Sequence, residues 1–462
     1  MSPMNTFHFR ELLEAPSGGQ RAQGPFGAGQ SGFTLLELMI AMLLGLLVLI
    51  GVTTLVMNTG KANREQAALA RMQENGRFAL SRIAADLRMA GSQYCSSFSN
   101  DPGSPDVGYP LRALWIRAAD PLPFGLPGRT QLTAAGIPLA PAGQPWALSP
   151  RYFIQGHECT TISNCSPVLA AATTLGAALP VPPVAGSAAN QRPLLGADVL
   201  TVRYLGGPGI PIADAHTAGG TPLQLAGTKN GVTLAGSMPW AAGELAMVAD
   251  CANAEVFNVN GGGSAIQPAG NAGLDQLLAY PSMLDADGDT RVFNLNRDFR
   301  TVTYFLRLRA NQDGGANIST LVRQENGQLQ AIADGVERLE FLYGVRVNTP
   351  AGAPQLHFLN ATQVQNGLSA GGAPLGCSKR PVKVRANEPG CLWRQVESID
   401  VALLVNTVTN VAATDTELFS FSAAIPPLVN SVPPAALPSG LPRGRMFRKE
   451  FRTRVNVRAF TE

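Results

Sequence analysis

A run of 25 residues, Phe33 to Met57, contains a single charged side chain, Glu37. About 20 consecutive apolar residues in a helix are enough to cross the hydrocarbon layer of a membrane. The sequence therefore predicts a membrane-spanning helix near its N-terminus.

The small residues next to this run, Gln30, Ser31 and Gly32, precede it. An ordinary secretory signal has its small cleavage-site residues after the apolar segment. Cleavage after Gly32 would remove only a polar leader, so the apolar helix would stay on the mature protein.

Glu37 is the anomaly within the apolar run. A carboxylate inside an apolar membrane helix costs about 2.5 kcal/mol or more and usually marks a function. Glu37 follows Phe33 by four residues, so an amine released by cleavage at Gly32 would lie within one helical turn of it. In a filament, the carboxylate could instead pair with the amine of a neighbouring subunit and fix the register of assembly. The alternative is a glutamate that reaches back to the lipid headgroups.

The segment 31–38, SGFTLLEL, resembles the N-terminal signal of type IV pilins and pseudopilins. The resemblance implies cleavage between Gly32 and Phe33 by prepilin peptidase, methylation of the Phe33 amine and a role for Glu37 in assembly. The leader of 32 residues is long for this class, and its charges are balanced. A cytoplasmic leader and a periplasmic body are therefore expected from the resemblance rather than from charge.

The helical pattern continues beyond the apolar run, so we expect one helix from about Thr34 to Ala90, with Gly91 as its stop. Its second half is amphipathic. The predicted apolar stripe contains Leu69, Met72, Gly76, Ala79, Ile83, Leu87 and Ala90, and the polar residues assigned to the other faces are Arg71, Glu74, Arg82 and Asp86.

From Gly91 onward, frequent Gly and Pro separate short runs that read as β-strands. In the last run, residues 451–458, apolar or small side chains alternate with Arg and Asn. The other runs are Val199–Leu205, Leu245–Ala249, Val302–Arg309, Leu339–Val347 and Ile399–Val405, and the predicted loops are Pro102–Pro150, Ala171–Pro193 and Thr349–Pro374.

These patterns predict an α+β fold. A long N-terminal helix, with a transmembrane half and an amphipathic half, packs on an antiparallel β-rich head of the pilin type that carries long loops. The expected parts are a cleaved leader (1–32), a transmembrane or filament-core helix (33–57), an amphipathic helix (58–91) and a periplasmic globular head (92–462).

All six cysteines lie after the apolar run, and an even number in an exported segment permits three disulfides. Sequence proximity suggests the pairs Cys159 with Cys165 and Cys377 with Cys391, which leaves Cys95 for Cys251. Six cysteines allow 15 pairings, so this scheme is a hypothesis. Buried free thiols are the alternative.

Asp285, Asp287 and Asp289 occupy alternate positions, as carboxylates do in calcium-binding loops. Thr290 stands where such a loop needs Gly, and Asn296 where it needs Glu. The simpler interpretation is a solvated turn, so no cofactor is expected and calcium is kept as an alternative.

Two further patterns are weak. Gly367, Ser369 and Gly371 match the GxSxG nucleophile motif, but no strand is predicted before them and no helix after them, so no enzyme is expected.

Arginines between 443 and 458 could form a basic face, yet the net charge is only +3 and no aromatic residues alternate with them for base stacking. Nucleic acid is therefore not the expected partner.

Blocks around 76–91, 243–251 and 334–345 are similar to the PilW family of minor pilins. This resemblance implies an inner-membrane subunit that enters a type IV pilus, with prepilin peptidase, major and minor pilins and a tip adhesin as partners. A type II secretion pseudopilin remains an alternative with the same signal. A membrane-anchored adhesin or calcium-dependent binding module is the alternative from another class.

Overall fold

The computed structural model describes the chain from Gly32, with gaps. The described residues are 32–93, 96–97, 113–116, 131–132, 138–139, 153–161, 164–167, 194, 196–212, 223–224, 228–229, 232–233, 240–249, 253–260, 265–266, 291–309, 317–326, 328–348, 354–376, 391–413, 417–423, 427–431, 437, 441 and 444–457.

Helix α1, Leu35–Met89, contains 55 residues and confirms the predicted long helix. It ends at the predicted stop, where Gly91 adopts a positive φ of 71° that a glycine tolerates. The Gly91 N–H donates to the carbonyl of Arg203, 2.9 Å away, and so ties the end of the helix to a strand. The chain divides into two compact units, residues 1–60 and residues 61–462, and α1 contributes to both.

The second half of α1 packs against β-strands through one face. Side chains spaced three or four residues apart share a helix face, and here they enter a common core with strands of two sheets. The buried residues of α1 are Ala68, Met72, Gly76, Ala79, Ile83, Ala84, Asp86 and Leu87.

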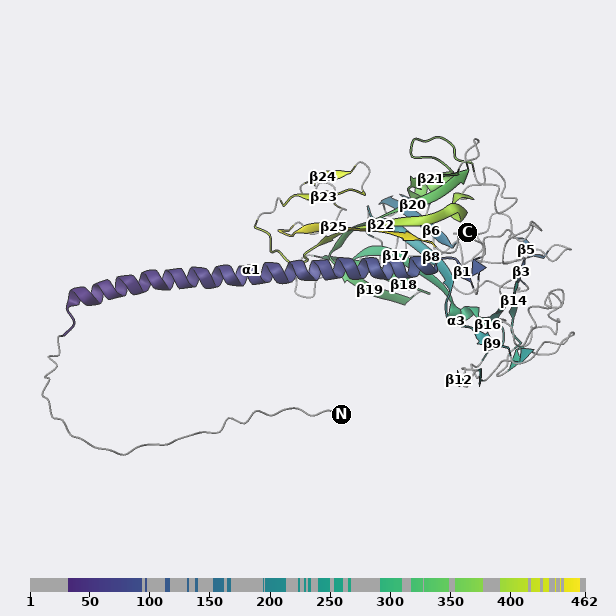
Figure 1. Ribbon diagram of the computed structural model, residues 1–462, viewed down its shortest axis with the longest axis horizontal. Helices are drawn as coiled ribbons and strands as arrows, with labels where there is room; N and C mark the ends of the chain where they lie inside the picture. Colours follow the sequence, from purple (N-terminus) through teal and green to yellow (C-terminus); the bar gives the residue numbers. More distant parts are fainter. Residues whose placement is uncertain are drawn as a thin grey trace, which may run out of the picture. The chain divides into compact units, whose positions relative to one another are not determined.

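A six-stranded antiparallel sheet supplies much of this core (Figure 1). Its strands run in the order β19-β18-β17-β8-β6-β7. Their bounds are β6 Ile154–Thr161, β7 Asn164–Ser166, β8 Val199–Leu205, β17 Phe299–Arg309, β18 Ile318–Glu325 and β19 Gln328–Asp334.

A four-stranded antiparallel sheet in the order β21-β20-β22-β25 supplies the rest. The chain passes from the first sheet to the second at Gly335, whose φ of 83° and crowding by Asn406 leave no room for a side chain. The bounds are β20 Val336–Asn348, β21 Pro354–Leu359, β22 Val396–Asn406 and β25 Arg448–Asn456, with the short helices α4 Ala361–Asn366 and η5 Cys391–Gln395 nearby.

A third sheet of five strands has a core of its own, which includes Trp240, Phe257 and Val292. Its order is β3-β14-β13-β16-β9, and β3 and β14 are parallel. The bounds are β3 Ala113–Ile116, β9 Ile210–Pro211, β13 Leu245–Ala249, β14 Asn253–Asn258, β16 Arg291–Asn294 and the following helix α3 Leu295–Asp298.

The other described strands form two-stranded ribbons. They are β1 Ser92–Gln93 with β2 Ser96–Ser97, β4 Gln131–Leu132 with β5 Pro138–Leu139, β10 Leu223–Gln224 with β15 Ala265–Ile266, β11 Thr228–Lys229 with β12 Val232–Thr233, and β23 Phe419–Phe421 with β24 Leu428–Ser431.

Five of the six predicted strands lie within observed ones, and the sixth, 451–458, overlaps β25, which ends at Asn456. Two predicted loops are wrong in part. The stretch Pro102–Pro150 contains β3, β4 and β5, and Thr349–Pro374 contains β21 and α4. The start of α4 was encoded by a capping box that the sequence analysis missed: Asn360 and Gln363 each bond to the other's backbone N–H. The third predicted loop lies outside the described residues.

Candidate processing and assembly site

The peptide bond between Gly32 and Phe33 lies in an irregular, exposed stretch just ahead of α1. The Phe33 side chain is 89% exposed, and no atom lies within 4 Å of a Cβ built on Gly32. A protease can reach this bond without unwinding the helix that follows.

The first turn of α1 is closed by Thr34 and Glu37. The Glu37 N–H donates to Thr34 Oγ1 at 3.2 Å, and the Thr34 N–H donates to Glu37 Oε2 at 3.0 Å. The Thr34 hydroxyl also donates to the same carboxylate oxygen, 3.1 Å away. This reciprocal pattern is a capping box, which satisfies backbone donors that have no partner within the helix. The predicted functional carboxylate therefore also has a local structural role.

The first half of α1 exposes its apolar side chains all round, from Leu35 to Met57. By length and composition the helix can cross a membrane. Its threonines fit this setting because Thr53 and Thr54 donate their hydroxyl hydrogens to the carbonyls of Leu49 and Ile50, at 2.7 and 3.0 Å. The hydroxyl groups of both threonines are thus satisfied within the helix.

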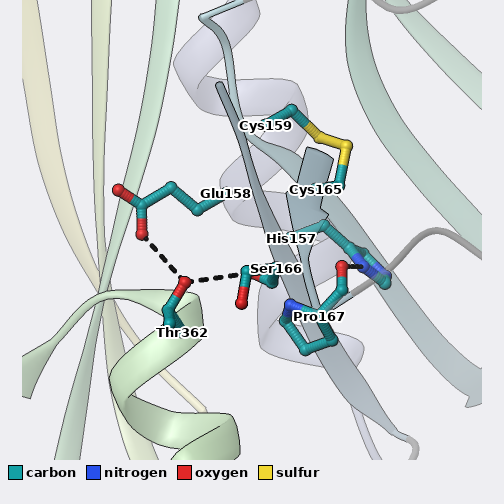
Figure 2. The surroundings of a disulfide bond; sticks show 7 residues. All are labelled: His157, Glu158, Cys159, Cys165, Ser166, Pro167 and Thr362. Carbon is teal, nitrogen blue, oxygen red and sulfur yellow. Dashed lines mark hydrogen bonds between the residues drawn. A yellow bond between two sulfur atoms is a disulfide. The ribbon is translucent and has the colours of Figure 1, made fainter. Parts of the chain in front are cut away.

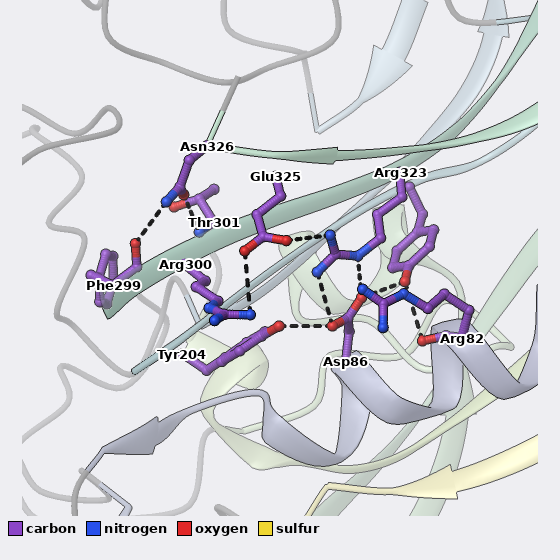
Figure 3. Close-up of polar contacts among 10 residues, drawn as sticks. Arg82, Asp86, Tyr204, Phe299, Arg300, Thr301, Arg323, Glu325 and Asn326 are labelled. Atoms are coloured by element: carbon purple, nitrogen blue, oxygen red, sulfur yellow. Dashed lines mark hydrogen bonds and ion pairs between the residues drawn. The ribbon is translucent and has the colours of Figure 1, made fainter. Parts of the chain in front are cut away.

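The second half of α1 carries a buried carboxylate, Asp86, which is 4% exposed (Figure 3). Arg323 donates to it through Nε at 2.7 Å and Nη2 at 3.2 Å. Tyr204 donates at 2.7 Å, and Tyr304 donates to the second carboxylate oxygen. Burial alone would raise the pKa of Asp86, but these hydrogen bonds outweigh it and hold the pKa below its usual value.

The prediction that Asp86 faces outward is therefore wrong. Its position, three residues after Ile83 and one before Leu87, is within the period of the apolar stripe, and the charge alone argued for exposure. The tertiary structure brings Tyr204, Tyr304 and Arg323 to it from β8, β17 and β18. No local sequence signal identifies these partners, because they are more than 100 residues away.

Cys159 and Cys165 form a disulfide across the β6–β7 pair, as their spacing predicts (Figure 2). Both are nearly buried, in a cluster with Val199, Phe305 and Val322. This bridge closes the edge of the six-stranded sheet.

Side chains around the disulfide connect it to α4. Thr362 donates to either Glu158 or the carbonyl of Ser166, each 3.3 Å away. On the same strand, His157 lies 2.7 Å from the carbonyl of Pro167, and burial lowers the pKa of this histidine to about 4. His157 is therefore neutral at physiological pH.

The remaining predicted sites fall largely outside the described residues. This applies to Cys95, Cys251 and Cys377, and to the three aspartates 285, 287 and 289. Cys391 is the first residue of η5, and its side chain lies outside the described part of the structure. Within the described ranges, no group of three or more His, Cys, Asp or Glu residues is arranged to hold a metal ion.

Ser369 of the GxSxG pattern lies in a tight turn after α4. Its hydroxyl oxygen accepts the N–H of Ala373 at 3.0 Å, and its own N–H donates to the Ala373 carbonyl at 2.8 Å. The segment before it is a short helix and the segment after it is not helical, so the strand-turn-helix context of a nucleophile elbow is missing at this position.

The described arginines of β25 do not form one free basic face. Arg448 is buried and pairs with Glu337 at 2.7 Å. Arg452 and Arg454 both pair with Asp400 on the neighbouring strand β22. The charge of the described arginines in β25 is therefore partly neutralised within the sheet, and Arg443 and Arg458 lie outside the described residues.

An exposed apolar helix that begins beside an accessible Gly-Phe bond, and whose second half enters the core of a β-rich unit, defines a pilin-like subunit with a membrane anchor. Comparison with protein families finds two matches. The model of the prokaryotic N-terminal methylation motif matches residues 27–53, and that of type IV pilus-assembly protein W matches residues 303–459. These two matches support the assignment of the chain as a type IV minor pilin of the PilW family.

The PilW match covers β18 to β22 and β25, together with most of β17. It therefore includes Arg323 and Tyr304 of the Asp86 contacts. It favours type IV pilus assembly over the secretion and adhesin alternatives. No curated protein and no solved structure matches the chain.

Proposed function

We propose that prepilin peptidase cuts this chain between Gly32 and Phe33 and that the new Phe33 amine is then methylated. The support is the accessible bond directly before a capped, exposed apolar helix. Residues 33–57 then anchor the subunit in the inner membrane and later enter the core of the pilus. The exposure of this half of α1, next to a half that is buried against strands, carries the proposal.

Glu37 pairs with an N-terminal amine after processing, in its own subunit or in a neighbour. In the uncut chain the Thr34 donors hold its carboxylate at the first turn. Cleavage places the cationic amine of Phe33 one residue before Thr34, so opposite charges come within one turn of an apolar helix. Such a pair sets the register in which a subunit is added.

The rest of the chain, residues 58–462, forms the part that lies in the periplasm and contacts other minor pilins, the major pilin or a tip adhesin. Its role in this proposal is structural, without catalysis and without a bound cofactor. The antiparallel sheets packed on α1 supply a rigid support for such contacts.

The test is the N-terminal sequence and mass of the protein recovered from pili. The expected mature chain begins at Phe33 and carries one added methyl group. Gly32→Val should block cleavage, because a β-branched residue replaces the glycine at the bond that the peptidase must bind. Gly45→Val, at an exposed glycine within α1, is the matched control and should be processed normally. Working pili that contain residues 1–32 would refute the proposal.

Assembly is tested separately in a strain that lacks the chain. We expect fewer pili and recovery of the chain together with pilus subunits. Normal piliation with loss of adhesion alone would instead support a membrane-anchored adhesin.

A further inference from the structure

Asp86 is the only charged residue among the side chains that α1 buries. Its carboxylate takes donors from three strands, so it is held in a pocket made by Tyr204, Tyr304 and Arg323. Figure 3 labels two of these donors, Tyr204 and Arg323. Arg323 is itself buried, with a side chain that is 2% exposed. Two buried groups of opposite charge therefore face each other across the helix–sheet contact.

The apolar contacts of α1 discriminate weakly between neighbouring registers. Buried positions recur every three or four residues, so a slide of four residues puts Ala79 in the place of Ile83, and Ile83 in the place of Leu87. An apolar side chain meets an apolar pocket in both registers. Volumes change, but no charge is stranded.

The contacts of Asp86, in contrast, discriminate strongly between the native register and a shifted one. A slide of one turn, about 5.4 Å, brings either Arg82 or Ala90 to the position of Asp86. Arg82 would set a second cation against buried Arg323, and Ala90 would leave Arg323 with Glu325 but without the buried carboxylate of Asp86. Removing one partner of a buried ion pair is strongly unfavourable, because the other charge stays desolvated.

A second contact adds a steric constraint. A Cβ built on Gly76 lies 2.7 Å from the ring of Phe451, so strand β25 approaches the helix where a glycine permits it. Phe451 is only partly buried and belongs to the strand at the end of its sheet. The ring can move aside, so this contact constrains the register less than the buried charge does.

We propose that the pocket of Tyr204, Tyr304 and Arg323 is a register lock for α1, with Asp86 as the positioning residue. The lock keeps the strands from sliding along the helix when α1 is drawn out of the bilayer into the pilus. The consequence for assembly rests on the proposed function, whereas the fixed register is a property of the chain alone.

Disulfide cross-linking of the purified full-length chain in detergent tests the lock. Asn75 donates to the Asp334 carbonyl at 3.2 Å, so cysteines at 75 and 334 report the native register. Cysteines at 71 and 334, or at 79 and 334, report a slide of one turn in either direction. In the parent chain we expect only the native pair to form, as identified by peptide mapping.

Asp86→Ala should raise the yield of a shifted cross-link by about tenfold, because a loss of one or two kcal/mol changes a ratio of states by that much. Gly76→Ala is the matched control: it crowds Phe451 and lowers the unfolding midpoint, but the shifted yield should stay at the parent value. Arg77→Ala, on the exposed side of α1, should change neither quantity.

A lower unfolding midpoint for Asp86→Ala without a shifted cross-link would overturn the lock and leave Asp86 with a purely stabilising role. If this variant does not fold, the yield of the shifted cross-link is measured for Asp86→Asn instead. Asparagine keeps the size of the side chain and one acceptor oxygen. Cross-linking needs neither cleavage nor pili, so its failure is distinct from a failure of processing at Gly32.

Discussion

Glu37 and Asp86 are two carboxylates on one helix, and they are held by donors of different origin. Glu37 bonds to Thr34, three residues earlier, so its geometry is set within a single turn. Asp86 bonds to side chains that lie 118, 218 and 237 residues away in the sequence. Substitutions at Glu37 should therefore act locally, whereas those at Asp86 should act on the tertiary structure.

The two roles of Glu37 can be separated by substitution. Glu37→Gln keeps an acceptor oxygen for Thr34 but removes the charge, so we expect an intact first turn and a failure to assemble. Thr34→Ala removes the cap at a cost of about 1 kcal/mol and should increase amide exchange over residues 35–38 in detergent. Thr59→Ala is the control, because that hydroxyl bonds to the Leu55 carbonyl within the helix. Normal assembly of Glu37→Gln would show that its charge is not needed.

Asp198 makes the stability of the chain depend on pH. It lies just before β8, is 6% exposed and accepts the Phe341 N–H at 2.9 Å. Burial raises the pKa of this carboxyl well above its usual value, and the charges of Glu340 and Glu158 add to the rise, against Arg338. A raised pKa of an acid means that the folded chain binds the proton more tightly than the unfolded chain does.

The stability contributed by the protonated Asp198 is present below pH 4 and is lost as pH rises toward the folded-state pKa. Asp198→Asn does not titrate and keeps an acceptor for Phe341. We expect the variant to gain stability relative to the parent as pH rises, by about 1.4 kcal/mol for each unit by which the pKa is raised. Urea unfolding of the full chain at several pH values measures this. A difference that does not change with pH would contradict the assignment to Asp198.

At the scale of elements, strand β6 depends on a covalent bond as well as on its ladder. It pairs with β8 on one side and with the three-residue strand β7 on the other. So short a strand gains little from its own hydrogen bonds, because ordering each residue costs entropy. The Cys159–Cys165 bridge holds β7 in place and keeps Thr362 of α4 near Glu158 and Ser166.

Replacing both Cys159 and Cys165 by alanine should lower the free energy of unfolding by about 2 kcal/mol, the value expected for a short closed loop. Chemical unfolding under oxidising conditions measures the loss. Chemical unfolding of the same variant in the presence of a reductant is the control for any contribution of the other cysteines. Unchanged stability would mean that the β6–β7 pair holds without the bridge.

At the scale of the whole molecule, the described part of residues 61–462 contains several buried apolar clusters; the largest includes the second half of α1, and another belongs to the five-stranded sheet. β8 and β17 are neighbours in the six-stranded sheet, with Leu205 opposite Phe299, yet the chain between them builds most of the five-stranded sheet. The two ends of this insertion meet where the Gly206 N–H donates to the Asp298 carbonyl at 2.8 Å. The insertion ends before residue 303, where the match to PilW begins.

Separate cores should open separately. In native-state hydrogen exchange at low denaturant concentration, we expect β13, β14 and β16 to exchange as one unit, with a smaller opening free energy than β17, β20 and β22. The smaller core buries fewer large side chains, so less apolar surface opposes its opening. A single shared opening free energy would show that the two cores unfold together.

The sequence predicted the elements whose signals are local. The length and apolar run of α1 and the alternation in β25 follow from the period of side chains along one segment. The disulfide Cys159–Cys165 also belongs here, because six residues separate the two cysteines and one hairpin brings them together. The capping boxes at Thr34 and Asn360 also follow from local spacing, but they were recognised only in the structure.

The tertiary structure alone decided which distant residues meet. Asp86 lies within the period of the apolar stripe, but its charge argued for exposure, and its burial depends on contacts with Arg323, Tyr204 and Tyr304 from three strands. The insertion between β8 and β17 was likewise hidden, because strand pairing is set by contacts across the sheet rather than along the chain. Local periodicity determines that a segment is a helix or a strand. The free energy of burying a charge or pairing an edge depends on partners that only the folded chain supplies.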